Sequence, residues 1–104
     1  MAKIPDEIVK SIKNFRANIQ SDIQVKKIII FGSYAKGNFS ADSDVDVCII
    51  TEQSKNNYLT LLKIIPKIID IDLRIEPVVF SEKEFNASAV FGLLKEIKKY
   101  GIEI

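Results

Sequence analysis

Two aspartates, Asp44 and Asp46, stand at the start of a predicted strand and are separated by a single valine. Because side chains on a strand alternate between its two faces, both carboxylates are expected on one side, about 6.6–7 Å apart along the backbone. Two carboxylates this close repel each other, and a divalent cation would remove that repulsion. Hard oxygen ligands suit Mg²⁺, which keeps waters and can bind nucleotide phosphates at the same time. Asp44 and Asp46 are therefore candidate metal ligands, with a solvated strand end as the alternative.

A glycine-serine pair, Gly32-Ser33, comes earlier in the chain, directly after an apolar run that ends at Phe31. A glycine at the end of a buried strand lets the backbone approach a ligand closely. Exposed backbone N–H groups at such a turn form a nest for anions, and the Ser33 hydroxyl adds a donor. An ordinary strand-to-turn glycine is the alternative for this pair taken alone. Together with the two aspartates, the pair favours nucleotide chemistry, which needs a phosphate cradle beside a metal site.

Three other phosphate and metal motifs do not fit the same region. The segment Gly32–Gly37 has the glycine spacing of a P-loop, but Asn38-Phe39 stands where Lys and Ser/Thr are required. The third glycine of a dinucleotide fingerprint is missing. An EF-hand loop that began at Asp42 would need a glycine in place of Val47 and a glutamate in place of Gln53. We exclude all three motifs.

Hydrophobic periodicity predicts the elements that position these residues. They alternate along the chain: a helix over 5–20, a strand over 25–31, a mostly loop segment with one helical turn over 32–43, a strand over 44–50, a helix over 56–69, a strand over 71–80 and a helical region that begins after 81. The helix over 56–69 is expected to bend or end near Pro66. The segment Ser81–Glu84 fits a capping box, and Gly101 follows a predicted helix end. The order α-β-β-α-β-α predicts the α/β (α+β) class.

Length and composition narrow the function classes. The chain has 104 residues, of which 47% are hydrophobic and 28% charged, so we expect one soluble globular domain over residues 1–104. A net charge of +1 gives no case for bulk electrostatic capture of DNA or of an anionic membrane. Without histidine there is no Ser-His-Asp triad, imidazole base or histidine-rich zinc site. We expect a cytoplasmic protein, because the sequence has a single cysteine, no signal peptide and no apolar run long enough to span a bilayer.

The segments Phe31–Gly37 and Asp42–Asp46 resemble the signature of the minimal nucleotidyltransferases, the smallest members of the DNA polymerase β-like nucleotidyltransferase superfamily. The order of strands and helices agrees with that family over most of the chain. The resemblance implies a nucleotidyltransferase fold, with a small mixed sheet of at least three strands flanked by helices. It also implies transfer of a nucleoside monophosphate from an NTP, usually ATP, with pyrophosphate leaving and Mg²⁺ held by three carboxylates.

The third carboxylate that the resemblance implies should lie on the third predicted strand. Alternation there would place four side chains on one face, namely Asp70, Asp72, Arg74 and Glu76. We prefer Glu76, because Pro77 keeps its backbone extended and because the spacing to the predicted cap at Ser81 resembles the family's strand-acid-then-helix arrangement. Asp72 is the second choice, and a surface strand acid is the alternative for Glu76. Members of the family commonly carry aspartate at this place, so a glutamate would depart from the pattern. Arg74 could pair with a phosphate or with Asp72.

These roles give a mechanistic hypothesis. Two Mg²⁺ ions about 3.5–4 Å apart would bridge Asp44 and Asp46 and neutralise the triphosphate. Gly32 and Ser33 would hold the leaving phosphates, and the third acid would help to deprotonate the attacking hydroxyl. Lys36 is a further candidate for phosphate binding, with a solvated loop lysine as the alternative.

The expected partners follow from the small size of the chain and from the resemblance. Little of the chain remains to build a second substrate pocket, so we expect a macromolecular acceptor beside the NTP. Many chains of this family are paired with a HEPN-type protein as a toxin–antitoxin system, some add AMP to the toxin, and this chain is similar to that antitoxin group. The apolar C-terminal segment Ile102–Ile104 is expected to pack on its own core, although pairing with the sheet or a homo-oligomer stays open.

Two other function classes remain as alternatives. One is a catalytically silent protein of the same fold that neutralises a partner by contact, and the other is a nucleotide- or RNA-binding regulatory domain. The intact Gly-Ser and Asp-x-Asp motifs favour an enzyme over both. Because the lysines are scattered, we do not expect a nucleic-acid partner.

Overall fold

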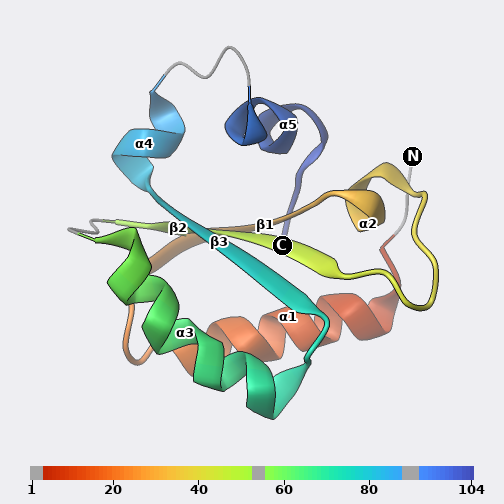
Figure 1. Cartoon of the computed structure of the whole chain (residues 1–104), viewed down its shortest axis with the longest axis horizontal. Helices are drawn as coiled ribbons and strands as arrows, with labels where there is room; N and C mark the ends of the chain where they lie inside the picture. The colour runs from red at the N-terminus through yellow and green to blue at the C-terminus, as the bar shows by residue number, and fades with distance from the viewer. Residues whose placement is uncertain (1–3, 53–55, 88–91) are drawn as a thin grey trace.

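A four-stranded mixed sheet forms the centre of the computed structural model, which describes residues 4–52, 56–87 and 92–104 (Figure 1). The strands are β1 (Val25–Phe31), β2 (Val45–Thr51), β3 (Ile75–Ser81) and β4 (Ile102–Glu103), in the spatial order β3-β2-β1-β4. β1 pairs antiparallel with β2 and with β4, and β2 pairs parallel with β3. The predicted fold class is confirmed, and the C-terminal segment pairs with the sheet of its own chain.

Helices cover both faces of this sheet (Figure 1). The described helices are α1 (Asp6–Ile19), α2 (Ser33–Lys36), α3 (Asn57–Ile71), α4 (Glu82–Asn86) and α5 (Leu93–Tyr100). α1 and α3 pack on one face, and α4 and α5 lie on the other (Figure 1). None of the helices in the described part of the chain is both long enough and apolar enough to cross a membrane.

Side-chain alternation along the strands divides the core into two layers. The layer under α1 and α3 takes strand residues such as Ile28, Ile30, Val45, Val47 and Ile49. The layer under α5 takes Ile29, Phe31, Cys48, Ile50 and Ile97. Because strand side chains alternate, residue 46 on β2 shares the face of Cys48 and Ile50. Asp46 therefore belongs to the α5 side of the sheet.

The boundary between α3 and β3 was predicted wrongly. α3 continues through Pro66 as far as Ile71, because Ile64 and Ile68 bury the same side of the helix on both sides of the proline. Such packing outweighs the hydrogen bond that proline removes. β3 consequently begins only at Ile75. The expected alternation of four polar side chains from residue 70 to residue 76 on one strand face is therefore wrong.

The start of the last helical region was predicted correctly, and its continuity was not. The Ser81 side chain accepts a hydrogen bond from the Glu84 N–H at 3.1 Å, and the Glu84 carboxylate accepts one from the Ser81 N–H at 2.9 Å. This is the expected capping box. The helix that it opens ends at Asn86, and a separate helix, α5, follows from Leu93.

Candidate active site

Asp46 and Glu76 lie side by side at the beginning of two parallel strands. Their Cα atoms are register partners in the β2–β3 ladder. On its other side, Asp46 is the register partner of Phe31, the last residue of β1, which is followed directly by Gly32. Chain segments far apart in sequence therefore bring Gly32, Asp46 and Glu76 to one end of the sheet.

The backbone at Gly32 comes against the Asp46 carboxylate. Gly32 has a φ of +73°, a conformation that L side chains rarely adopt. A Cβ atom added there would lie 3.0 Å from Asp46 Cγ and would collide with Oδ2. The group that approaches the Gly32 backbone in the structure is the Asp46 carboxylate, and the predicted approach to a phosphate ligand stays a prediction.

The loop after Gly32 is held by the short helix α2 and by an aromatic contact. Tyr34 is buried, and its ring stacks on Phe39 with 4.5 Å between the ring centroids. The helix ends at Gly37, whose φ of +83° is the left-handed conformation of a helix C-cap. The loop that presents Gly32 and Ser33 is therefore anchored in the core of the protein.

The surroundings of Asp46 disfavour its charged form. The pKa of Asp46 is raised to about 6, first because partial burial disfavours the carboxylate and then because of the hydrogen bond and the charge of Glu76. The charges of Asp44 and Glu96 raise it further. Asp44, which precedes β2 instead of opening it, is exposed to solvent, and so is Glu76.

This acidic cluster suits a hard divalent cation, because a positive charge would offset both the burial of the Asp46 carboxylate and the repulsion that together raise its pKa. No three His, Cys, Asp or Glu side chains already gather around one point in the described ranges 4–52, 56–87 and 92–104. Mg²⁺ in nucleotide sites is commonly held by one or two carboxylates together with phosphate oxygens and water. The cluster fits that pattern better than an all-protein metal cage.

Asp72 and Arg74 form a pair away from the strand. The Arg74 guanidinium donates to both Asp72 carboxylate oxygens, from Nε at 3.0 Å and from NH2 at 2.9 Å. This hydrogen bonding lowers the pKa of Asp72. Asp72 caps the C-terminus of α3 and also hydrogen-bonds the Ser11 side chain of α1, so the structure places Glu76 and not Asp72 beside Asp46. Of the two partners open to Arg74, the structure shows Asp72.

Lys36 is engaged with the C-terminal helix α5. Its Nζ lies 2.6 Å from a Glu96 carboxylate oxygen and 5.1 Å from the centroid of the Tyr100 ring. The hydrogen bond to Glu96 raises the pKa of Lys36. The charge of Glu96 also raises the pKa of Asp46, so Glu96 interacts with both the loop lysine and the acidic cluster. No local pattern pointed to Glu96, since only the packing of α5 against β1 brings it there.

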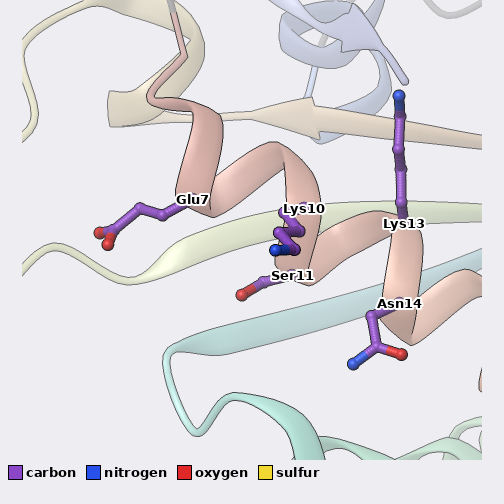
Figure 2. Close-up of a pocket in the computed structure, with 5 residues that line it drawn as sticks. All are labelled: Glu7, Lys10, Ser11, Lys13 and Asn14. Carbon is purple, nitrogen blue, oxygen red and sulfur yellow. The ribbon is translucent and has the colours of Figure 1, made fainter.

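A hollow on the outer side of α1 is a separate feature. It is lined by Glu7, Lys10, Ser11, Lys13 and Asn14, all from the one helix (Figure 2). α1 covers the sheet face opposite to the one that carries Asp46. This hollow is therefore no part of the candidate nucleotide site.

Comparison with known proteins decides the family. The family model for the nucleotidyltransferase domain matches residues 10–104, which is nearly the whole chain. The chain belongs to the nucleotidyltransferase domain family. The resemblance inferred from Phe31–Gly37 and Asp42–Asp46 is thereby confirmed, and the protein is a nucleotidyltransferase.

Two relatives of this nucleotidyltransferase come from Methanocaldococcus jannaschii, and each bears the name "Putative protein adenylyltransferase". The first is 32% identical and spans 94% of this chain and 99% of its own length. The second is 29% identical over 88% of this chain and 92% of its own length. Both are therefore similar to the nucleotidyltransferase over almost their entire sequences.

Two solved structures share the nucleotidyltransferase fold at 18% sequence identity. One, described as a "putative nucleotidyltransferase" from Sulfolobus solfataricus, has a TM-score of 0.66 over 93% of this chain and 78% of the solved chain. The other, described as a toxin-antitoxin with AMP-PNP, has a TM-score of 0.63 over 90% of this chain and 69% of the solved chain. These likenesses support the fold of the nucleotidyltransferase.

The raised pKa of Asp46 predicts how the stability of the metal-free nucleotidyltransferase depends on pH. The carboxyl has a pKa of about 6 in the folded chain against an ordinary value of 3.8, so the folded state binds more protons between these values. The free energy of unfolding is then expected to fall as the pH rises from about 4 to about 6 through this group. Urea unfolding in a chelating buffer measures this effect. At each pH, the free energy of unfolding of Asp46→Asn is subtracted from that of wild type. A difference that does not change with pH would contradict the prediction.

Proposed function

We propose that this nucleotidyltransferase transfers AMP from ATP to a hydroxyl group of a partner protein, as the antitoxin of a pair with a HEPN-type protein. The observation that carries the proposal is the contact of Asp46 with Glu76 and with the backbone of Gly32. The names of the relatives as protein adenylyltransferases support the acceptor class. The structural likeness to a toxin-antitoxin with AMP-PNP supports both the nucleotide and the kind of partner.

Asp44, Asp46 and Glu76 are the residues that would hold Mg²⁺ in this proposal. When bound, Mg²⁺ would supply positive charge that stabilises the negative charge on the transferred α-phosphate and on the leaving pyrophosphate. Mg²⁺ that is also bound by phosphate oxygens needs only a few protein carboxylates, as this site provides. Gly32 and Ser33 would offer backbone N–H groups and a hydroxyl to the leaving phosphates.

The reaction needs one bond to form and one to break. The acceptor oxygen bonds to the α-phosphorus of ATP, the bond from that phosphorus to the bridging oxygen breaks, and pyrophosphate leaves. Glu76 accepts the proton of the hydroxyl, since its exposed carboxylate lies beside Asp46. Lys36 stays a candidate for phosphate binding, for which it would have to leave Glu96.

Transfer is tested with ATP labelled in the α-phosphate and, in parallel, in the γ-phosphate. The chain is incubated with Mg²⁺ and the protein encoded by the neighbouring gene. We expect label on that protein from the α-phosphate alone. Tight binding of the two proteins without any label would instead support a silent protein that neutralises its partner by contact. Absence of both would overturn the proposal.

Two matched amide substitutions distinguish the roles of Glu76 and Asp72. Glu76→Gln is expected to lower AMP transfer by about 10²-fold or more, because it removes the proposed proton acceptor and one of the three carboxylates that would hold Mg²⁺. Asp72→Asn should leave transfer within about threefold of wild type and should lower stability by about 1 kcal/mol, because it weakens the pair with Arg74. Initial rates of labelling and urea unfolding measure both effects. Equal losses of transfer in the two variants would remove the special role of Glu76.

A further inference from the structure

Helix α3 carries a second apolar side that faces solvent. Four of its residues follow one another at steps of four, three and four, and they are Tyr58, Leu62, Ile65 and Ile69, with exposed fractions of 66%, 46%, 41% and 64%. Leu59 and Leu73 extend this surface, at 56% and 77%. We call these six residues the α3 stripe. It holds most of the large apolar side chains that the described residues expose.

The α3 stripe makes α3 apolar over more of its surface than an ordinary amphipathic helix. The opposite side of α3 already supplies Ile64 and Ile68 to the core, so charged side chains are confined to a narrow strip at Lys63, Lys67 and Asp70. A helix that is apolar on nearly all sides is normally covered on all of them. Contiguous exposed patches of this kind mark interaction surfaces.

We propose that the α3 stripe is the contact between two copies of this chain, packed as an antiparallel pair of α3 helices about a two-fold axis. The 4-3-4 spacing is that of the a and d positions that form the seam between paired helices. A two-fold contact requires a surface that is complementary to itself. The stripe meets this requirement because it contains no charged residue that would face its own copy.

The antiparallel direction follows from the charges at the helix ends. About an axis at the middle of the stripe, Leu62 of one copy lies opposite Ile65 of the other, and Tyr58 lies opposite Ile69. The same pairing sets Asp70, on the polar strip beside the contact, level with the N-terminal end of the other α3, where the helix dipole is positive. A parallel pair would instead align the two dipoles unfavourably.

The area of the stripe is close to what a dimer needs. A buried aromatic side chain covers roughly 150–250 Å² and Leu or Ile somewhat less, so at exposures of 41–77% the six residues present on the order of 600 Å². A standard interface buries about 800 Å² from each partner. α3 packs on the sheet face opposite to Asp46, so this contact leaves both candidate active sites open and does not depend on the proposed function.

The mass of the chain in solution, measured by sedimentation or light scattering over a dilution series, tests this proposal. We expect a concentrated sample to have twice the 11.7 kDa mass of one chain. Leu62→Glu and Ile65→Lys should each weaken self-association by about tenfold or more, because each buries a charge in the centre of the contact. Lys63→Glu, on the polar strip of the same helix, is the matched control and should remain dimeric.

A mixture of the two charged variants tests the antiparallel geometry. Since residue 62 faces residue 65 of the other copy, equal amounts of Leu62→Glu and Ile65→Lys should form a mixed dimer that neither variant forms alone. Circular dichroism checks that each variant is folded. A wild-type chain that is monomeric at every concentration would overturn the proposal, as would a Leu62→Glu variant that associates as tightly as wild type.

Discussion

Asp46→Asn is expected to lower AMP transfer by about 10³-fold or more and to leave the metal-free chain at least as stable as wild type. Transfer falls because the variant removes the best-placed carboxylate between Gly32 and Glu76. Stability does not fall, because the wild-type carboxylate is disfavoured by burial and by the charges around it, as its raised pKa shows. Labelling rates and thermal unfolding in chelating buffer measure the two effects in one preparation.

Asp42→Asn is the matched control for this prediction. Asp42 is an exposed loop aspartate, and it is not among the groups that shift the pKa of Asp46. The control should label the partner protein at the wild-type rate. An Asp46→Asn variant that keeps transfer within tenfold of wild type, or that loses stability at neutral pH, would show that the acidic cluster is not organised around this residue.

Gly32→Ala should damage both stability and transfer. An alanine must adopt the φ of +73°, which costs about 1–2 kcal/mol, and its Cβ collides with the Asp46 carboxylate. Overpacking of this kind adds about 1–3 kcal/mol. The displaced carboxylate should reduce transfer by about 10²-fold or more. Urea unfolding and the labelling assay measure the two losses.

Gly92→Ala separates the two causes. Gly92 also has a positive φ, of +84°, but a Cβ there would meet no atom within 4 Å. This control should therefore lose about 1–2 kcal/mol of stability and keep its transfer activity. In addition, Asp46→Ala combined with Gly32→Ala should recover part of the lost stability, because the colliding carboxylate is gone. Equal stability losses at the two glycines would refute the collision.

The sequence was most informative where a local pattern determines local structure. The apolar run Val25–Phe31 formed the predicted strand, and the segment Ser81–Glu84 formed the predicted capping box. Gly32 has a positive φ and lies close to another chain segment, as a glycine at a strand end can, although its neighbour is the Asp46 side chain. Each of these features depends on a few neighbouring residues, so periodicity and turn chemistry suffice to predict it.

The sequence was less informative where distant segments decide the outcome. Pro66 suggested a break, but the burial of Ile64 and Ile68 kept α3 helical through it. Moving the start of β3 to Ile75 removed Asp72 from the strand face and left Glu76 on it. The preference for Glu76 over Asp72 thus agrees with the geometry, although the alternation used to compare them did not hold.

The positions of Asp44 and Glu96 also depend on distant segments and could not be predicted from local patterns. Asp44 stands just before β2, where the next N–H, that of Val45, donates to the Arg74 carbonyl at 2.8 Å. Its position relative to Asp46 therefore depends on the turn before β3 and not on strand alternation alone. Glu96 reaches the cluster only because α5 packs across the sheet.

Cys48 makes the chain convenient for probe attachment. It is the only cysteine of the sequence, its side chain is fully buried in the layer under α5, and burial raises the pKa of its thiol to about 12. Maleimide reagents attack the thiolate, which this site disfavours. Fluorophores or spin labels can therefore be coupled to cysteines introduced on α3 or α5 while the native thiol stays in place, unreactive until the chain unfolds.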